Sequence, residues 1–291
     1  MPEESRRRAA GTVIIAWTGT VAVSQAPHVL IAQALGLSEA AVDGLWLGSA
    51  VVLVAVCASW SRARSLLPYA AVLLAVVALI GIVLPLVGGW LPLDGRSELV
   101  QAFGSKAVFF AAAVIMAIVL ARTAGSRQTT FVSSGDLRAP SSIRLPGRRR
   151  PLSWAVVGPV AAVLLFGLFA GVLVADGVFD AGDGARLLEA APLILVCAAF
   201  NAFGEEVIHR AGPLSRLVGA VGPGHAVAMT AVWFGLGHYA GSIPSGIEGV
   251  VMSALLGLLL GRAMVATRGL GWPVVMHIAV DLVVFATIAV A

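Results

Sequence analysis

The chain has 291 residues, of which 59% are hydrophobic and only 12% are charged, and its mean hydropathy is +0.97. A soluble core cannot absorb so much apolar sequence, so the composition indicates a polytopic membrane protein. The formal net charge is +4. Because the basic residues form short clusters between apolar runs, as in cytoplasmic loops, nucleic acid is excluded as the expected partner.

A membrane-spanning helix needs about 20 mostly apolar residues, and nine segments of the chain meet this requirement. We therefore expect an all-α fold, a polytopic transmembrane helix bundle of eight to nine spanning helices. The first segment is interrupted by Gln25, Pro27 and His28, which can split it into a span and an interfacial piece. The predicted spans are residues 11–35, 41–60, 66–90, 101–121, 153–175, 187–210, 224–240, 248–266 and 272–291.

The distribution of arginine predicts how the chain is oriented in the membrane. Arg6, Arg7 and Arg8 precede the first span, and basic residues recur in every second loop, whereas the opposite loops are acidic or nearly neutral. This pattern predicts a cytoplasmic N-terminus in a bacterial cytoplasmic (inner) membrane. The first apolar run is too long for the core of a signal peptide, so we expect it to be retained as a helix.

One long break divides the apolar segments. Residues 123–152 are rich in Ser, Pro, Gly and Arg, so we expect a flexible, basic cytoplasmic linker that can contact anionic lipid headgroups. It separates an N-terminal four-helix membrane unit, 1–122, from a C-terminal membrane domain, 153–291. Membrane lipid is therefore an expected partner, and the sequence leaves the oligomeric state open.

Most isolated polar or reactive residues have ordinary explanations. Cys57 and Cys197 lie inside apolar runs, where small buried hydrophobic residues are expected rather than a disulfide or a CxxC metal site. Lys106 lies near the outer end of its span, where its side chain can reach the interface. His28 is expected to act as polar contact between helices. The candidate catalytic residues therefore lie after residue 200.

Three short motifs in the last 90 or so residues carry that chemistry. A charged side chain near the centre of a spanning helix costs about 2.5–3.5 kcal/mol, so such residues usually mark a site. Each motif contains a pair of residues four positions apart, which share one face of a helix. Three facing helices can therefore bring two imidazoles and three carboxylates together. The motifs are EEVIHR from Glu205 and Glu206 to Arg210, FGLGH from Phe234 to His238, and HIAVD from His277 to Asp281.

Such a set of groups is sufficient to activate a water molecule. A carboxylate in an apolar setting is a competent general base, and an imidazole can hold the water or donate to the oxyanion of a tetrahedral intermediate. On its helix Asp281 can orient His277. No cofactor is required, but a divalent metal such as zinc on Glu205, His238 and His277 is chemically reasonable.

Each motif alone also has a structural explanation. A buried histidine often bonds to a backbone carbonyl, and a Glu–Arg pair near the inner face can be an anchor. His209 and His225 flank the inner interface, where polar residues are common, although His209 is four residues from Glu205 and could tune it. The three motifs together, in order and at helical spacing, favour a site.

The ordered motifs resemble those of a known family. EExxxR, FxxxH and HxxxN/D characterise the CPBP (Abi) intramembrane proteases, which are similar to the type II CAAX prenyl endopeptidases, and the match covers about residues 190–285. The resemblance implies that Glu205 is the base that activates water and that Glu206 pairs with Arg210. It implies that His238 helps to hold the water and that His277 and Asp281 stabilise the oxyanion. An ionised Asp281 only accepts hydrogen bonds, so direct donation requires its protonated form.

Other intramembrane protease classes lack their signatures in this chain. HExxH, the zinc site-2 motif, is absent, and Ser245 lies in an Ile-Pro-Ser-Gly turn rather than in a rhomboid GxSG motif. The acidic residues at 176–183 lie in a loop, unlike the GxGD helix of presenilin-type enzymes. The expected function is an intramembrane peptidase acting on a membrane-associated peptide or protein; the alternatives are a non-catalytic scaffold or bacteriocin-immunity-type protein and, third, a transporter.

One spacing argues for an unusual seventh helix. At about 1.5 Å per residue, Glu205 and His277 share a depth near the inner face, whereas His238 lies roughly 20 Å from the inner end of its helix. We therefore expect a submerged site on the inner side, with the seventh helix extending into the cytoplasm after a re-entrant or amphipathic 211–223 stretch. A His238–Glu205 separation beyond roughly 8 Å would contradict a shared site.

Overall fold

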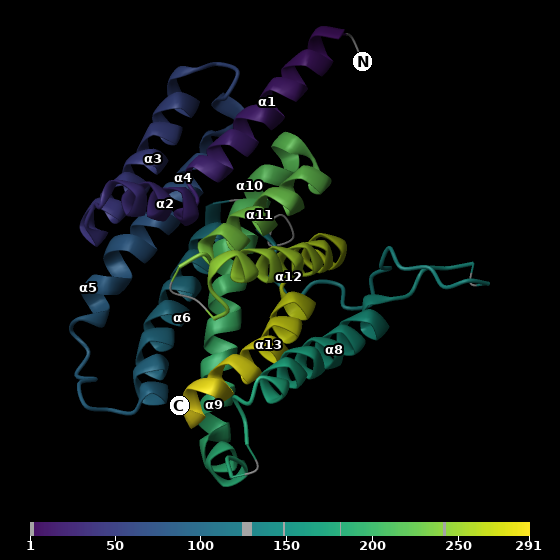
Figure 1. Ribbon diagram of the computed structural model, residues 1–291. Helices are drawn as coiled ribbons and strands as arrows, with labels where there is room; N and C mark the ends of the chain where they lie inside the picture. The colour runs from purple at the N-terminus through teal and green to yellow at the C-terminus, as the bar shows by residue number, and fades with distance from the viewer. Residues whose placement is uncertain (1–2, 124–129, 148, 181, 241–242) are drawn as a thin grey trace. The chain divides into compact units, whose positions relative to one another are not determined.

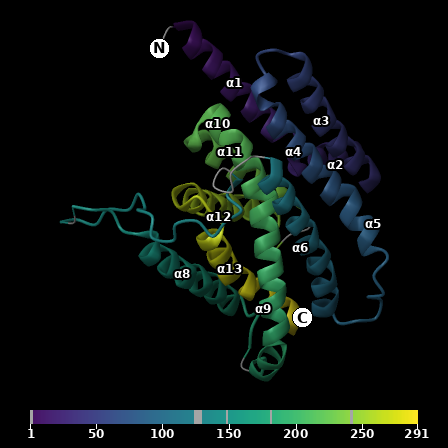
Figure 2. The same ribbon diagram turned by 180° about the vertical axis from the view of Figure 1, so that it is seen from behind.

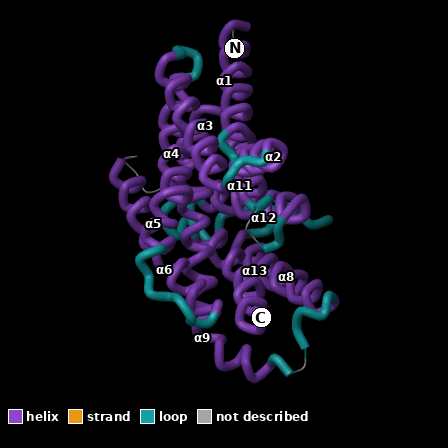
Figure 3. The backbone as a smooth tube through the Cα atoms, turned by 60° about the vertical axis from the view of Figure 1, so that its left-hand side comes forward, coloured by secondary structure: helices purple, strands orange, loops and turns teal. Residues whose placement is uncertain are grey.

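The computed structural model describes residues 3–123, 130–147, 149–180, 182–240 and 243–291. Helices form the regular structure of these ranges, which contain no strand and only an isolated bridge between Pro140 and Ser153 (Figure 3). The all-α prediction is confirmed. The longer helices are α1 (Glu3–Ala22), α2 (Gln25–Leu35), α3 (Glu39–Ser59), α4 (Leu67–Ala78), α6 (Glu98–Thr123), α8 (Trp154–Ala175), α9 (Gly184–Glu205), α10 (Gly212–Val221), α11 (Pro223–Gly237), α12 (Gly246–Thr267) and α13 (Gly271–Val290).

Within the described ranges, 7 helices are long and apolar enough to cross a membrane, or 8 if one bent pair forms a single span. The bent pair is 10–22 with α2, which meet at 51°, so the predicted split of the first segment is confirmed. The seventh predicted span, 224–240, is not long enough within the described residues: it becomes α11, whose 15 residues extend only about 22 Å. Gly222, with φ 82°, separates α11 from α10.

The chain folds into two compact units whose segments interleave along the sequence. The first unit comprises Met1–Pro85 and Gly212–Arg262, and the second comprises Leu86–Ala211 and Ala263–Ala291. The predicted division at 122 and 152 follows composition along the chain and stays a prediction, whereas the two units group segments by their contacts.

In the first unit, α3 packs on α4 and α1 contacts α10 and α11 (Figure 1). The break between α1 and α2 leaves the carbonyl of Val23 without a helical partner, and Trp46 Nε1 donates to it at 2.7 Å. Thr20 and Tyr69, both buried, share a hydrogen bond of 2.7 Å. Polar groups near the break between α1 and α2 are therefore paired by hydrogen bonds within this unit.

In the second unit, α9 contacts α6 and α13, and α13 also contacts α8 (Figures 1 and 2). The rings of Phe110 and Phe200 stack with centroids 4.4 Å apart across α6 and α9. A Cβ added at Gly204 would lie 2.5 Å from Phe109, so α6 approaches α9 closely just before Glu205. Cys197 is a free, buried thiol in the adjoining apolar cluster, as predicted.

The described part of 123–152 is hydrogen-bonded to the turn between α12 and α13. Asp136 N donates to Thr267 O at 2.7 Å, and Leu270 N donates to Ser133 O at 2.7 Å. Gly135, at φ 75°, lies so close that a Cβ there would be 2.4 Å from Thr267 O. We name residues 133–139 the clamp segment.

Composition predicts a flexible linker at 123–152, and within it the clamp segment makes backbone hydrogen bonds. Composition reports on what side chains can bury, whereas the clamp segment is held chiefly by main-chain N–H and C=O groups. Trp272 Nε1 adds a side-chain contact by donating to Leu137 O at 3.0 Å. The clamp segment thus fixes the start of α13, the helix that carries His277 and Asp281.

Candidate active site

The EEVIHR motif coincides with a change in helix type. The α-helix α9 ends at Glu205, and a π-helical segment, η3 (Glu206–Ala211), follows it. Short π segments inside α-helices often occur at functional sites because the extra residue in the turn redirects side chains. Glu205 and Glu206 therefore stand at the junction, and both belong to the second unit together with α13.

Glu206 and Arg210 form a buried ion pair. Arg210 Nη1 donates to Glu206 Oε1, and both side chains are 0% exposed. The predicted pairing is confirmed. The same Oε1 also lies 2.7 Å from Nδ1 of His277, which donates to it. One carboxylate oxygen therefore receives a guanidinium from its own helix and an imidazole from α13.

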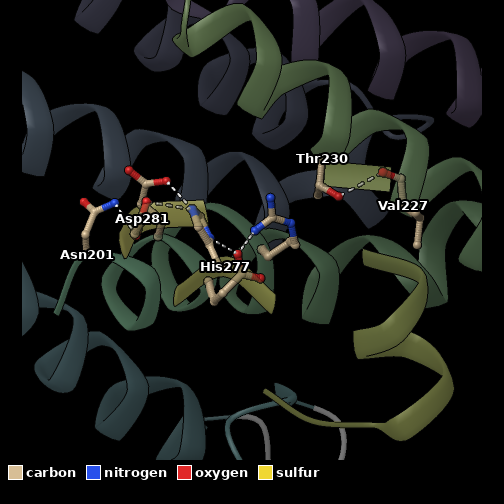
Figure 4. Close-up of polar contacts among 8 residues, drawn as sticks. Asn201, Val227, Thr230, His277 and Asp281 are labelled. Atoms are coloured by element: carbon tan, nitrogen blue, oxygen red, sulfur yellow. Dashed lines mark hydrogen bonds and ion pairs between the residues drawn. The ribbon is translucent and has the colours of Figure 1, made fainter. Parts of the chain in front are cut away.

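The bond to Glu206 fixes which nitrogen of His277 faces the other acids. With Nδ1 donating to Glu206, Nε2 points to Glu205 Oε2 at 3.5 Å and to Asp281 Oδ1 at 3.8 Å (Figure 4). His277 is buried, and the side chain of Glu205 is 15% exposed. Glu205 is thus the most accessible of the three carboxylates within this cluster.

Proton placement follows from these contacts. Ionised carboxylates only accept hydrogen bonds, and Nε2 faces two of them. A proton on Nε2, or on Glu205 or Asp281, satisfies this arrangement. A proton therefore has only a short distance to move between Nε2 and the carboxylate of Glu205 or Asp281. A centre that transfers protons to and from a reacting group requires such short distances.

The partner that orients His277 differs from the sequence interpretation. Asp281 was expected to orient the ring, but its nearest oxygen is 3.8 Å away, on the Nε2 side. Glu206 makes the short contact of 2.7 Å, on the Nδ1 side. The reason is tertiary: residues four apart on α13 lie near each other, but the closer acid comes from the facing helix.

Asn201 was not assigned a role from the sequence. Its Nδ2 donates to Asp281 Oδ2 at 3.0 Å, and the residue is 6% exposed (Figure 4). A signal was available, because Asn201 lies four residues before Glu205 and therefore on the same helix face. Asn201 thus joins α9 to Asp281 at the edge of the cluster.

His238 belongs to the first unit, so its convergence with Glu205 and His277 stays a prediction. It caps α11, and its Nδ1 lies 2.9 Å from Phe234 O. A carbonyl only accepts, so Nδ1 carries the proton and Nε2 carries a lone pair in the neutral ring. The separate helix α10 precedes α11, as expected for the 211–223 stretch.

The other polar residues make local contacts. The ring of His209 lies 6.3 Å from that of Phe109, and Lys106 Nζ lies 5.7 Å from the same ring. Within the first unit, Trp17 Nε1 donates to His225 Nδ1 at 3.3 Å, and His28 Nδ1 lies 2.8 Å from Ser24 O. These residues have packing or capping partners of the kind expected outside a site.

A metal centre was considered for Glu205, His238 and His277. Across the described residues, no group of three or more His, Cys, Asp or Glu side chains is arranged to hold a metal ion. Nδ1 of His277 is engaged by Glu206, and its Nε2 faces two carboxylates. Metal dependence stays a prediction, and no step of the proposed reaction is assigned to a metal.

The exposed surface is consistent with a membrane environment. Val163 and Leu164 on α8 are 71% and 66% exposed, and long apolar helices recur through the chain. Together with the buried acidic, basic and imidazole groups, these helices define an integral membrane protein with a polar centre inside it.

The family comparison agrees with the motifs. Residues 187–283, about one third of the chain, match the model of the type II CAAX prenyl endopeptidase Rce1-like family. The predicted family resemblance is confirmed over this region, which contains all three motifs. The comparison with curated proteins gave no match, and the comparison with solved structures gave none either.

Proposed function

We propose that the protein is an intramembrane peptidase that hydrolyses a peptide bond of a membrane-associated substrate. The observation that carries this proposal is the contact of Glu205 Oε2 with His277 Nε2 at 3.5 Å, in a region that matches a family of endopeptidases. The cytoplasmic N-terminus and the bacterial cytoplasmic membrane belong to the same proposal, on the basis of the arginine distribution.

Glu205 acts as the general base. It takes a proton from a water molecule, and the resulting hydroxide attacks the carbonyl carbon of the peptide to form a tetrahedral oxyanion. His277, protonated at Nε2, stabilises this oxyanion by a hydrogen bond. The C–N bond then breaks as the amine leaves with the proton that Glu205 received, giving a carboxylic acid and an amine.

The remaining residues support these two groups. Glu206 and Arg210 keep His277 in the orientation that aims Nε2 at Glu205, and Asp281 lies beside the same nitrogen. The resemblance implies one more role, that of holding the water, for His238, whose Nε2 carries a lone pair. Because the side chain of Glu205 is 15% exposed, it is the acid that a substrate and water can reach.

The test is cleavage by the full chain reconstituted in lipid vesicles. The probe is a library of quenched fluorescent peptides, half of them prenylated at a C-terminal cysteine. Glu205→Gln removes the base, so the cleavage rate should fall by a factor of about 10² or more. The unfolding temperature should stay near that of the wild type. Cleavage at the wild-type rate by Glu205→Gln would refute the assigned base.

A matched variant and a chelator complete this experiment. Glu189→Gln makes the same substitution at an exposed position of α9 and should leave cleavage unchanged. Assays with and without a chelator address the metal: unchanged rates support the metal-free reaction, and loss of cleavage that zinc restores would support a metal-bound water.

A second candidate is a non-catalytic scaffold or immunity-type protein. It is favoured by the complete burial of Glu206 and Arg210, which resembles a structural polar network. This candidate predicts that Glu205→Gln keeps the cellular phenotype, whereas Arg210→Ala lowers stability. The peptidase predicts loss of function in both variants.

A further inference from the structure

Asn201 lies next to the reactive groups and is the only asparagine in the chain. On α9 it precedes Glu205 by one helical turn, so the two side chains share a face. Its Nδ2 donates to Asp281 Oδ2 at 3.0 Å. In the proposed reaction the proton is on His277 Nε2, so Asp281 is ionised and only accepts hydrogen bonds; the nitrogen end of the amide therefore faces Asp281.

The other end of this amide has no partner in the structure. Asn201 is 6% exposed, and across the described residues no donor forms a hydrogen bond with its Oδ1. A buried acceptor without a partner lowers stability relative to an apolar group of similar size. The other buried residues of α9 need no such partner, since they are Ile194, Cys197, Ala198, Ala202 and Gly204.

We propose that Asn201 has two roles in the proposed peptidase, on which this inference rests. Its nitrogen positions Asp281, and its Oδ1 binds a hydrogen-bond donor of the reaction. That donor is an O–H of the attacking water or an N–H of the substrate peptide. Packing alone does not explain an asparagine here, because an apolar side chain would fill the space without a buried, unpaired acceptor.

The position of Asp281 shows what the first role achieves. Asn201 holds Oδ2, and the other oxygen, Oδ1, lies 3.8 Å from His277 Nε2. Without the amide, the carboxylate can rotate about its side-chain bonds and lose this orientation. The amide thereby links α9 to the acid that faces the same nitrogen as Glu205.

The activity test compares amide and ester substrates. We use a peptide that the wild type cleaves and Glu205→Gln does not, and the matching ester in which oxygen replaces the scissile N–H. Asn201→Ala should lower kcat about 10- to 100-fold, with KM within about threefold, as expected for a lost hydrogen bond to a charged or reacting group. Asn201→Asp keeps an acceptor but loses the donor to Asp281, so it should also be slower.

The two substrates identify the donor. If water is the donor, Asn201→Ala slows amide and ester equally; if the peptide N–H is the donor, the amide is slowed and the ester much less. Cys197→Ala, one turn earlier on the same helix, is the control and should stay within about twofold of wild type. Turnover of both substrates within twofold of wild type by Asn201→Ala and Asn201→Asp would overturn the inference.

A stability cycle separates this inference from the proposed function. Unfolding temperatures of Asn201→Ala, Asp281→Ala and the double variant should be non-additive, because each single change leaves a buried group unpaired. If the wild type cleaves no peptide, the proposed function fails, and the cycle still decides whether Asn201 positions Asp281. Additive changes would overturn that pairing.

Discussion

Nδ1 of His277 lies 2.7 Å from Oε1 of Glu206, the oxygen that also accepts from Arg210. A single carboxylate oxygen therefore links the π-helical segment η3 to α13. Because both donors point at one buried atom, the orientation of the imidazole depends on an ion pair that belongs to another helix. Stability and reactivity are coupled at Glu206.

Removing the guanidinium should destabilise the protein strongly. Arg210→Met leaves Glu206 as a buried carboxylate without its ion-pair partner, which typically costs about 3–5 kcal/mol. We expect this loss in the free energy of unfolding, measured by denaturant titration in detergent. Arg262→Met, at an exposed position, is the control and should change it by less than about 0.5 kcal/mol.

The double variant Glu206→Met with Arg210→Met shows whether the loss of stability comes from the unpaired carboxylate. Replacing both members of a buried ion pair by apolar groups is often close to neutral, so the double variant should be more stable than Arg210→Met alone. If Arg210→Met unfolds like the Arg262→Met control, the ion pair does not stabilise the fold.

Two variants of Asp281 show whether the reaction depends on the polar contacts of this side chain. Asp281→Asn keeps an oxygen that accepts from Asn201 but replaces the carboxylate beside His277 Nε2 with a neutral amide, so cleavage should fall by no more than about tenfold. Asp281→Leu removes both contacts and should lower kcat by about 100-fold or more. Equal rates in the two variants would show that the polar contacts of residue 281 do not matter to the reaction.

The sequence predicted contacts within one helix better than contacts between helices. Glu206 and Arg210 pair because helical spacing alone places them together. The partner of His277 is not local: Glu206 from η3 supplies the short contact, whereas Asp281, four residues along α13, lies farther away. Sequence spacing contains no information about which helix faces which. Spacing places Asn201 on the face of Glu205, but its partner Asp281 lies on another helix and could not be predicted.

Hydropathy predicted the fold class but not every helix end. It identified the apolar segments because burial in lipid requires about 20 apolar residues. It also counted 224–240 as a span, although the positive φ of Gly222 and the end of α11 at Gly237 leave 15 residues. The order of the clamp segment could not be predicted from composition, because backbone hydrogen bonds, which leave no compositional signal, hold it in place.

Gly204 should be intolerant of a side chain because α6 lies against it. A Cβ there would be 2.5 Å from the ring of Phe109, so Gly204→Ala should cost about 1–3 kcal/mol of unfolding free energy. Gly167→Ala, with nothing within 4 Å, is the matched control and should not destabilise the protein. Adding Phe109→Leu to Gly204→Ala should restore part of the loss; no recovery would show that the ring is not the obstacle.

The clamp segment can be released by a single methyl group at Gly135. Its φ of 75° is unfavourable for alanine, and the added Cβ would lie 2.4 Å from the backbone oxygen of Thr267. Gly147 is the matched control, because its φ is 78° but nothing lies within 4 Å of the added Cβ. Both variants carry the strain of a left-handed residue, about 1–2 kcal/mol, and only Gly135→Ala also clashes with backbone.

Limited trypsin digestion of the reconstituted protein measures this release. Arg138 lies in the clamp segment, so its cleavage requires local opening, whose frequency rises as the local stability falls. We expect Gly135→Ala to be cut at Arg138 about tenfold faster than Gly147→Ala, with cleavage after Arg144 unchanged in both. Peptide hydrolysis should fall with the release, because the clamp segment fixes the turn before the helix of His277. Equal digestion at Arg138 in both variants would mean that strain in the glycine conformation, and not contact with Thr267, sets the order of this segment.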